Sequence, residues 1–222
     1  MSVWIVCFIV PMLVGFWAQH RVKSTFARNL EVPVANGMTG AQVARYVLDA
    51  NSLQDVPVEE TPGMLSDHYD PRTRSVHLSP PVFHGVSVAS TAVGAHEVGH
   101  AIQHAEAYAF FRARSAMFPA VQLASSAWSL FLVGGIFLNI LGFIWIAIAL
   151  YSVAVLFQFV TLPVEFDASR RANRQLSDLG LVAAREASGV RGTLKAAAWT
   201  YVAGALAAIG VLLYFLALLN NR

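Results

Sequence analysis

The chain has 222 residues, of which 56% are hydrophobic and only 13% are charged, and its formal net charge is +2. This balance is far from that of a soluble globular domain, and so small a net charge argues against nucleic acid as a partner. A single cysteine, Cys7, excludes an intramolecular disulfide and is best interpreted as a small apolar core residue.

Long uncharged segments predict a multi-pass membrane protein. A single span needs about twenty apolar residues, so the uncharged stretch from Ser115 to Val164 should hold two helices joined by a turn between Gly134 and Asn139. No basic residue precedes the first apolar run, so we interpret it as a retained anchor rather than a signal peptide. We therefore expect about four transmembrane helices, at 2–18, 116–134, 137–161 and 197–219.

The basic residues predict how these helices are oriented. With the N-terminus outside, every Lys and Arg except Arg222 lies on the cytoplasmic side, and many lie next to span ends. We therefore expect a protein of the cell membrane whose polar segments face the cytoplasm. Basic residues placed beside spans favour contact with the anionic headgroups of the lipid bilayer.

The first polar segment, 19–115, has the elements of a small α+β subdomain. Thr39 and Gln42 form a capping box, which predicts a helix to about Ser52. A short strand is expected at 56–61, and alternation around a Pro-containing turn predicts a small hairpin at 67–78. A long helix should then run from Ser87 to about Tyr108.

That last helix carries the sequence His96-Glu97-Val98-Gly99-His100. Residues four apart share one helix face, so both imidazoles can reach a single zinc ion, and Glu97 can serve as the general base that takes a proton from water. The alternative is a core helix with two hydrogen-bonded histidines and a buried glutamate. We disfavour it because burying a carboxylate there gains nothing unless a metal compensates its charge.

A catalytic zinc site normally has three protein ligands and one open position. His104 lies more than about 10 Å along the helix from His96, too far to share its ion, and is better placed as a supporting or ordinary polar residue. Glu165 is the better candidate, since it is the first charged residue after the third span, with Pro163 opening a fresh helix segment. The alternative is a surface glutamate paired with Arg170 or Arg171.

Three segments together resemble those of a known family. His-Glu-Val-Gly-His-Ala-Ile-Gln-His at 96–104, Pro-Val-Glu-Phe-Asp-Ala-Ser-Arg-Arg-Ala at 163–172 and the hairpin sequence at 69–79 are similar to the YugP family of neutral zinc metallopeptidases, over nearly the whole chain. The resemblance implies a membrane-embedded zinc peptidase of the gluzincin type. It implies His96, His100 and Glu165 as ligands and Glu97 as base.

The wider HtpX-like relatives usually carry an aspartate four residues after the ligand glutamate. This chain has Ser169 there and Asp167 at the second position, which points to another helix face, so Ser169 is the alternative candidate for orienting a ligand. His68, Tyr69 and His77 are candidates for contacts with the substrate or the oxyanion. The sequence alone does not distinguish among these three candidates.

The predicted organisation is mainly α, with a cytoplasmic zincin-like metalloprotease subdomain. Its parts are a first transmembrane helix (1–18), the subdomain (19–115), a transmembrane hairpin (116–161), a cytoplasmic helical segment with the third ligand (162–196) and a fourth span with the C-terminus (197–222).

The predicted function is zinc-dependent hydrolysis of peptide bonds in a protein or peptide substrate at the cytoplasmic membrane surface. The alternative is a metal-binding membrane scaffold or adaptor without protease activity, although structural zinc sites usually depend on cysteine. A chain of this length leaves little room for a dedicated substrate-recognition domain. A regulatory membrane partner is therefore compatible with the sequence. Small residues such as Gly204 and Gly210 are compatible with a homo-oligomer.

Overall fold

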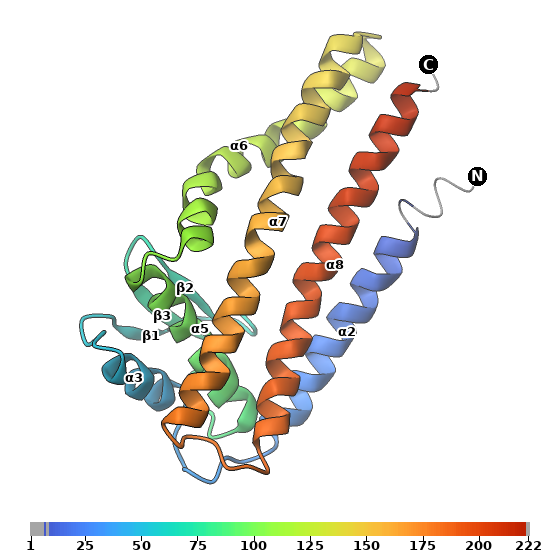
Figure 1. The fold of residues 1–222 in the computed structure, drawn as a ribbon. Coiled ribbons are helices and arrows are strands. Elements are labelled where there is room, and N and C mark those ends of the chain that lie inside the picture. The colour runs from blue at the N-terminus through green and yellow to red at the C-terminus, as the bar shows by residue number, and fades with distance from the viewer. Residues whose placement is uncertain (1–6, 8, 221–222) are drawn as a thin grey trace.

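The computed structural model describes residue 7 and residues 9–220. Within them the chain is mainly helical, with one small sheet (Figure 1). The elements in order are α2 (Val10–Leu30), α3 (Gly40–Ala50), β1 (Val58–Glu60), β2 (His68–Asp70), β3 (Ser75–Leu78), α4 (Pro80–Phe83), α5 (Val88–Ala105), α6 (Ala109–Phe137), α7 (Leu141–Asp178) and α8 (Ala187–Asn220).

Long apolar helices make up one half of the molecule. Within the described residues, three helices are long and apolar enough to cross a membrane: α6, α7 and the Ala187–Ala217 part of α8. The predicted pair of helices is present, but its turn lies later than expected, at 138–140, because α6 continues past Gly134 to Phe137 and α7 begins at Leu141. The expected first span at 2–18 lies partly outside the described residues, where α2 begins at Val10.

Pro163 does not open a new helix, so the predicted break before Glu165 is wrong. It lies inside α7, which continues for 38 residues from the apolar hairpin into the polar half of the molecule. Proline removes one backbone donor and usually kinks or ends a helix, yet the packing of Val164 and Glu165 in the interior keeps this one continuous. One helix therefore carries both the third span and the candidate third ligand.

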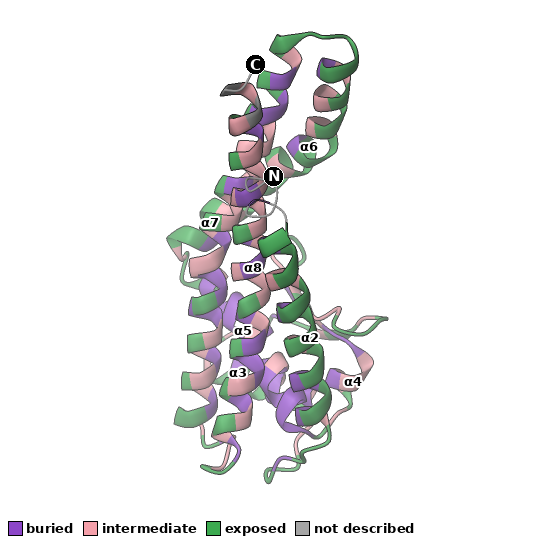
Figure 2. Cartoon of the chain, turned by 90° about the vertical axis from the view of Figure 1, so that its right-hand side faces the viewer, coloured by how far each residue is buried: buried purple, intermediate pink, exposed green. Residues whose placement is uncertain are grey.

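The polar half packs around α5. Figure 2 shows this helix mostly buried, whereas the outer end of the α6–α7 hairpin is largely exposed. The core of this half joins α5 to α3, to the sheet and to the lower parts of α7 and α8. The predicted capping box of α3 is confirmed: Thr39 accepts a hydrogen bond from the Gln42 backbone and Gln42 caps in return.

The sheet has the order β1-β3-β2. The predicted hairpin is confirmed as the antiparallel pair β2–β3, with His68 opposite His77. The predicted first strand is also present as β1, but it pairs in parallel with β3, a partner the sequence pattern did not indicate. This order leaves one edge of β2 unpaired, and all three residues of β2 line the cavity described below.

Candidate metal centre

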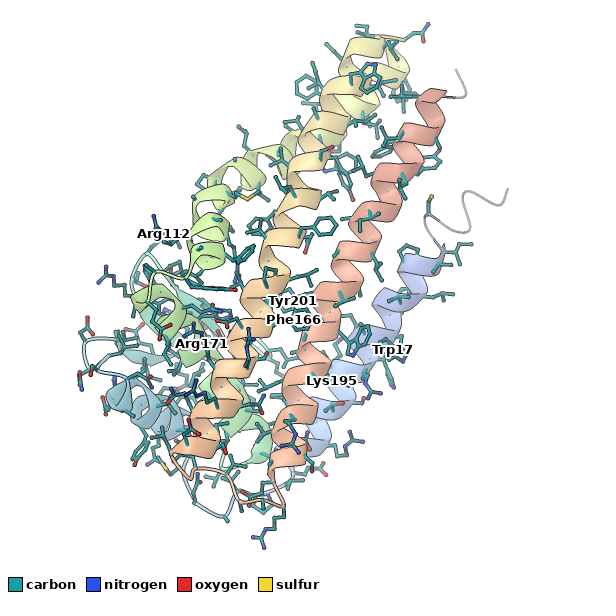
Figure 3. All side chains as sticks on the ribbon, in the orientation of Figure 1. Trp17, Arg112, Phe166, Arg171, Lys195 and Tyr201 are labelled. Carbon is teal, nitrogen blue, oxygen red and sulfur yellow. The ribbon has the colours of Figure 1, made fainter. Side chains whose placement is uncertain are left out.

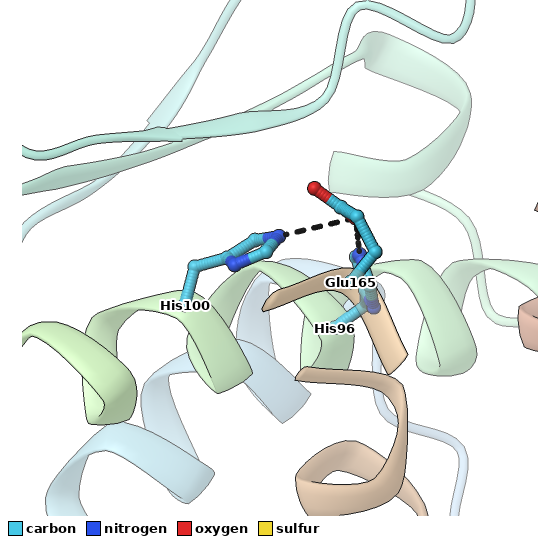
Figure 4. Close-up of side chains that lie close together, drawn as sticks. All are labelled: His96, His100 and Glu165. Atoms are coloured by element: carbon cyan, nitrogen blue, oxygen red, sulfur yellow. Dashed lines mark ion pairs between the residues drawn. The ribbon is translucent and has the colours of Figure 1, made fainter. Parts of the chain in front are cut away.

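Helix α5 begins at Ser87, whose side chain accepts a hydrogen bond from the Ser90 backbone, and it ends at Ala105 rather than near Tyr108. It presents His96 and His100 on one face, with their ring centroids 4.9 Å apart. Both Nε2 atoms point toward Glu165 of α7 (Figure 4). The distances from Glu165 Oε2 are 3.3 Å to His96 Nε2 and 3.6 Å to His100 Nε2. One ligand atom from each of the three residues falls within 4.8 Å of the other two, so the group could hold a metal ion.

The two carboxylate oxygens of Glu165 have different surroundings. Oε1 accepts a hydrogen bond of 3.0 Å from Arg114 Nη1, at the start of α6. Oε2 is buried and has no hydrogen-bond partner, although it faces the two imidazoles. A buried carboxylate oxygen without a partner is costly, and a cation held between it and the two nitrogens removes that cost. Two imidazole nitrogens and one carboxylate oxygen are also a zinc donor set that leaves a position open.

A glycine inside the histidine motif lets α7 come close enough to supply this ligand. A Cβ atom added at Gly99 would lie 2.7 Å from the carbonyl oxygen of Ala168 in α7. Any larger residue would therefore push the two helices apart. The sequence places Gly99 between the two histidines because this is where Glu165 must approach.

Asp167 supports His100 through an intermediate residue. Gln103, fully buried on α5, has its Oε1 3.0 Å from His100 Nδ1. Its amide donates to the Val164 carbonyl at 2.8 Å and to Asp167 Oδ2 at 3.0 Å. Asp167 therefore points away from the ligand face, as the sequence predicts, and reaches His100 only by way of Gln103. Sequence analysis missed Gln103, although its position three residues after His100 and on the same helix face was a usable signal.

The other two candidate supporting residues, Ser169 and His104, differ in what they contact. Ser169 Oγ lies 3.3 Å from His96 Nδ1, within reach of the second histidine ligand. His104 contacts neither the two histidines nor Glu165 among the described residues; its Nδ1 lies 2.9 Å from the hydroxyl of Tyr69. His104 lines the same cavity as His96 and His100, one further helical turn along α5.

Glu97 lies in the same cavity as the metal group and is 7% exposed. Burial raises the pKa of its carboxyl to about 7, and the neighbouring Glu165 acts in the same direction, whereas His96 opposes the shift. A carboxyl group with a pKa near neutrality can both accept and return a proton at physiological pH. This property is what the general-base assignment requires.

The cavity has a volume of about 780 Å³, and its walls come from different elements of the fold. The segment from Asp67 to Arg72, which includes the free edge of β2, forms one wall, and the start of α6 forms another. His68 and Tyr69 line it, as expected of substrate contacts. His77 is not among the residues that line it; its ring stacks on His68 at 4.7 Å between centroids and its Nε2 hydrogen-bonds Ser75.

Two lining residues were missed by sequence analysis. Arg114 looked like an ordinary basic residue beside a span, and Tyr201 like membrane-facing bulk in the last span. In the structure Arg114 binds Glu165, and Tyr201 of α8 lines the cavity with the ligands. Arg114 and Tyr201 differ from the residues around them only in having a partner more than thirty residues away in the chain. No local sequence pattern indicates such a partner.

Comparison with known proteins is consistent with this geometry. The family model described as "Putative neutral zinc metallopeptidase" matches residues 4–220. The chain is also 46% identical over 215 residues to a protein of Bacillus subtilis (strain 168) described as "Putative membrane protease YugP", with 96% of each chain covered. No solved structure matches.

Proposed function

Since the chain belongs to the family described as putative neutral zinc metallopeptidases, we propose that it is a membrane-embedded zinc endopeptidase that cuts protein or peptide substrates at the membrane surface. The observation that carries this proposal is the buried Glu165 Oε2, which has no hydrogen-bond partner and faces the Nε2 atoms of His96 and His100. Zinc is the metal of the family, and these three residues would hold it.

Each residue of the site then has a distinct chemical task. Bound zinc supplies Lewis acidity, which polarises the substrate carbonyl and makes water a better nucleophile. The Glu97 carboxylate accepts the proton of the attacking water and returns it to the nitrogen of the leaving amine. The free edge of β2 offers backbone hydrogen bonds to a substrate segment in extended conformation, the shape that a protease needs.

Gln103 and Ser169 hold the histidine rings rather than touch the substrate. Gln103 Oε1 accepts from His100 Nδ1–H, and this leaves Nε2 as the lone-pair atom that faces the metal position. Ser169 Oγ can do the same for His96 Nδ1. Arg114 binds Oε1 of Glu165, so that Oε2 is the oxygen left for the metal.

The active site is proposed to face the cytoplasm. The basic residues of α2, α6, α7 and α8 lie at the ends of these helices that adjoin the sheet, and this side should be cytoplasmic by the distribution of Lys and Arg. The relative from Bacillus subtilis is described as a membrane protease, which supports placement in the cell membrane. A metal-binding scaffold is disfavoured because a structural site has no use for Glu97 in the cavity.

The test compares the wild-type protein with Glu97→Gln, purified in detergent, for bound zinc and for cleavage of an unfolded polypeptide. We expect Glu97→Gln to keep zinc and to lose cleavage by at least about a hundredfold, since proton transfer is removed but the ligands are not. Glu31→Gln is the matched control, because Glu31 is exposed and remote from the cavity. A wild-type protein that binds no zinc, or a Glu97→Gln variant that still cuts normally, would contradict the proposal.

A further inference from the structure

Three helices carry an exposed aromatic residue followed, one helical turn closer to the sheet end, by a basic residue. Trp17 and Arg21 lie on α2, Phe166 and Arg170 on α7, and Trp199 and Lys195 on α8. The three aromatic side chains are 46%, 48% and 36% exposed, respectively. We call these six residues the interfacial ring: Trp17, Arg21, Phe166, Arg170, Lys195 and Trp199.

The three aromatic members of the ring lie at one level of the molecule. The Trp17 and Trp199 rings are in contact at 5.6 Å between centroids, and Arg21 lies over the Trp17 ring. Figure 3 shows Phe166 at a similar height along the helices, with Lys195 closer to the sheet end. Beyond this level α7 and α8 carry no charged residue as far as the hairpin and the last described turn.

This arrangement marks where the bilayer begins. Tryptophan prefers the boundary between hydrocarbon and headgroups, and Lys and Arg extend from there into the headgroup layer. The sequence of α6 likewise changes from charged to uncharged after Arg114, because the stretch that starts at Ser115 carries no charge. Four helices thus place the boundary at the same level.

The metal group lies at this boundary. Glu165 directly precedes Phe166 of the ring, and it is bonded to Arg114, the last charged residue before the span of α6. The α6 wall of the cavity changes in the same direction, from Arg112, Arg114 and Ser115 to Phe118 and Pro119 farther along the helix.

From these observations we infer that the substrate is the juxtamembrane segment of a membrane-anchored polypeptide, cut within about five residues of the end of its transmembrane span. An extended chain rises about 3.3 Å per residue, so it crosses a headgroup layer of roughly 5–8 Å in about two residues, and the cavity adds a few more. The inference rests on the proposed peptidase function. It adds the depth of the scissile bond and the anchoring of the substrate.

A series of anchored substrates tests the inference. The full-length protein is placed in liposomes with single-span substrates that carry one unstructured segment after a Gly/Ser spacer of about 3 or about 25 residues, and the same segment is also supplied in solution. We expect kcat/KM for the short spacer to exceed that for the long spacer at least tenfold. Since both are anchored, the comparison removes the effect of concentrating substrate in the membrane.

The outcomes separate the two proposals. Equal cleavage with short and long spacers overturns the juxtamembrane inference and leaves the peptidase function standing. Absence of cleavage of every substrate by the zinc-loaded wild-type protein, with Glu97→Gln as the blank, overturns the peptidase function and the inference with it.

The position of the boundary is also testable without activity. Cys7 is the only cysteine, so Cys7→Ser provides a background for single cysteines in nanodiscs. Phe159→Cys and Arg174→Cys lie on either side of Phe166 on α7, about 10–12 Å away along the helix, and both positions are exposed. We expect a polar maleimide to label Arg174→Cys at least tenfold faster than Phe159→Cys. Equal rates would overturn the placement of the metal group at the boundary.

Discussion

At the scale of single residues, the metal centre depends on side chains that direct the ligands as much as on the ligands themselves. Arg114 binds one oxygen of Glu165 and leaves the other facing the histidines, and Gln103 fixes the ring of His100. Supporting hydrogen bonds of this kind hold ligand rings in the orientation that binding requires. These two contacts orient Glu165 and His100 toward the position where a metal ion would bind.

Replacing Gln103 should weaken zinc binding without removing a ligand. Gln103→Leu keeps a similar volume but loses the contacts to His100, Val164 and Asp167, and we expect zinc affinity to fall about 10–100-fold. Competition with a chelating dye measures this affinity. Gln175→Leu is the control, since Gln175 hydrogen-bonds Asn51 away from the site, and equal zinc affinity in the two variants would contradict the role of Gln103.

The sequence predicts the ligand-bearing motifs better than their supports. His96 and His100 follow from helical spacing, and Glu165 from its position after a span. Gln103 has a local signal, its position three residues after His100, whereas Arg114 and Asp167 bind Glu165 and Gln103, respectively, which lie more than fifty residues away in the chain. No local pattern distinguishes Arg114 and Asp167 from ordinary charged residues.

At the scale of elements, the close approach of α5 and α7 is the feature that brings the ligands together. We expect Gly99→Ala to lower stability by about 1–3 kcal/mol, because its Cβ would lie 2.7 Å from the Ala168 carbonyl oxygen. Zinc affinity should fall as well, since Glu165 moves with α7. Thermal unfolding and zinc titration measure the two effects.

Gly192→Ala provides the control for that variant. Gly192 is also helical, but an added Cβ would meet nothing within 4 Å, so this change should be neutral or slightly stabilising. If Gly99→Ala behaves like Gly192→Ala in both measurements, the close packing of α5 on α7 is not what sets the site.

Elements with local signals were predictable, and those decided by tertiary packing were not. The capping box at Thr39 and the hairpin around Pro71 are local, and both are present. The continuity of α7 through Pro163 depends on burial against α5, which a rule about proline cannot anticipate. For the same reason the parallel pairing of β1 with β3 was not predicted.

At the scale of the whole molecule, the metal joins parts of the chain that are far apart in sequence, α5 and α7. Removing zinc should therefore lower Tm by several degrees, because the buried Oε2 of Glu165 then lacks a partner. Adding zinc back in excess should restore Tm, whereas magnesium should not, since imidazole ligands suit zinc. Thermal unfolding in detergent, with and without a chelator, measures this.

A variant without the ligand provides the control for the zinc effect. His96→Ala should show no change of Tm on chelation, because it lacks one of the three donors. A wild-type Tm that is the same with and without zinc would contradict a metal site between the two helices.

The unbroken path of α7 also gives the metal centre a mechanical link to the far side of the membrane. The helix has 38 residues, about 57 Å, and most of that length lies in apolar surroundings before it reaches Glu165. Such helices change their tilt when the hydrocarbon layer becomes thinner or thicker. Because Glu165 lies on α7 and the two histidines lie on α5, we expect a change of bilayer thickness to alter the distance between Glu165 and the histidines.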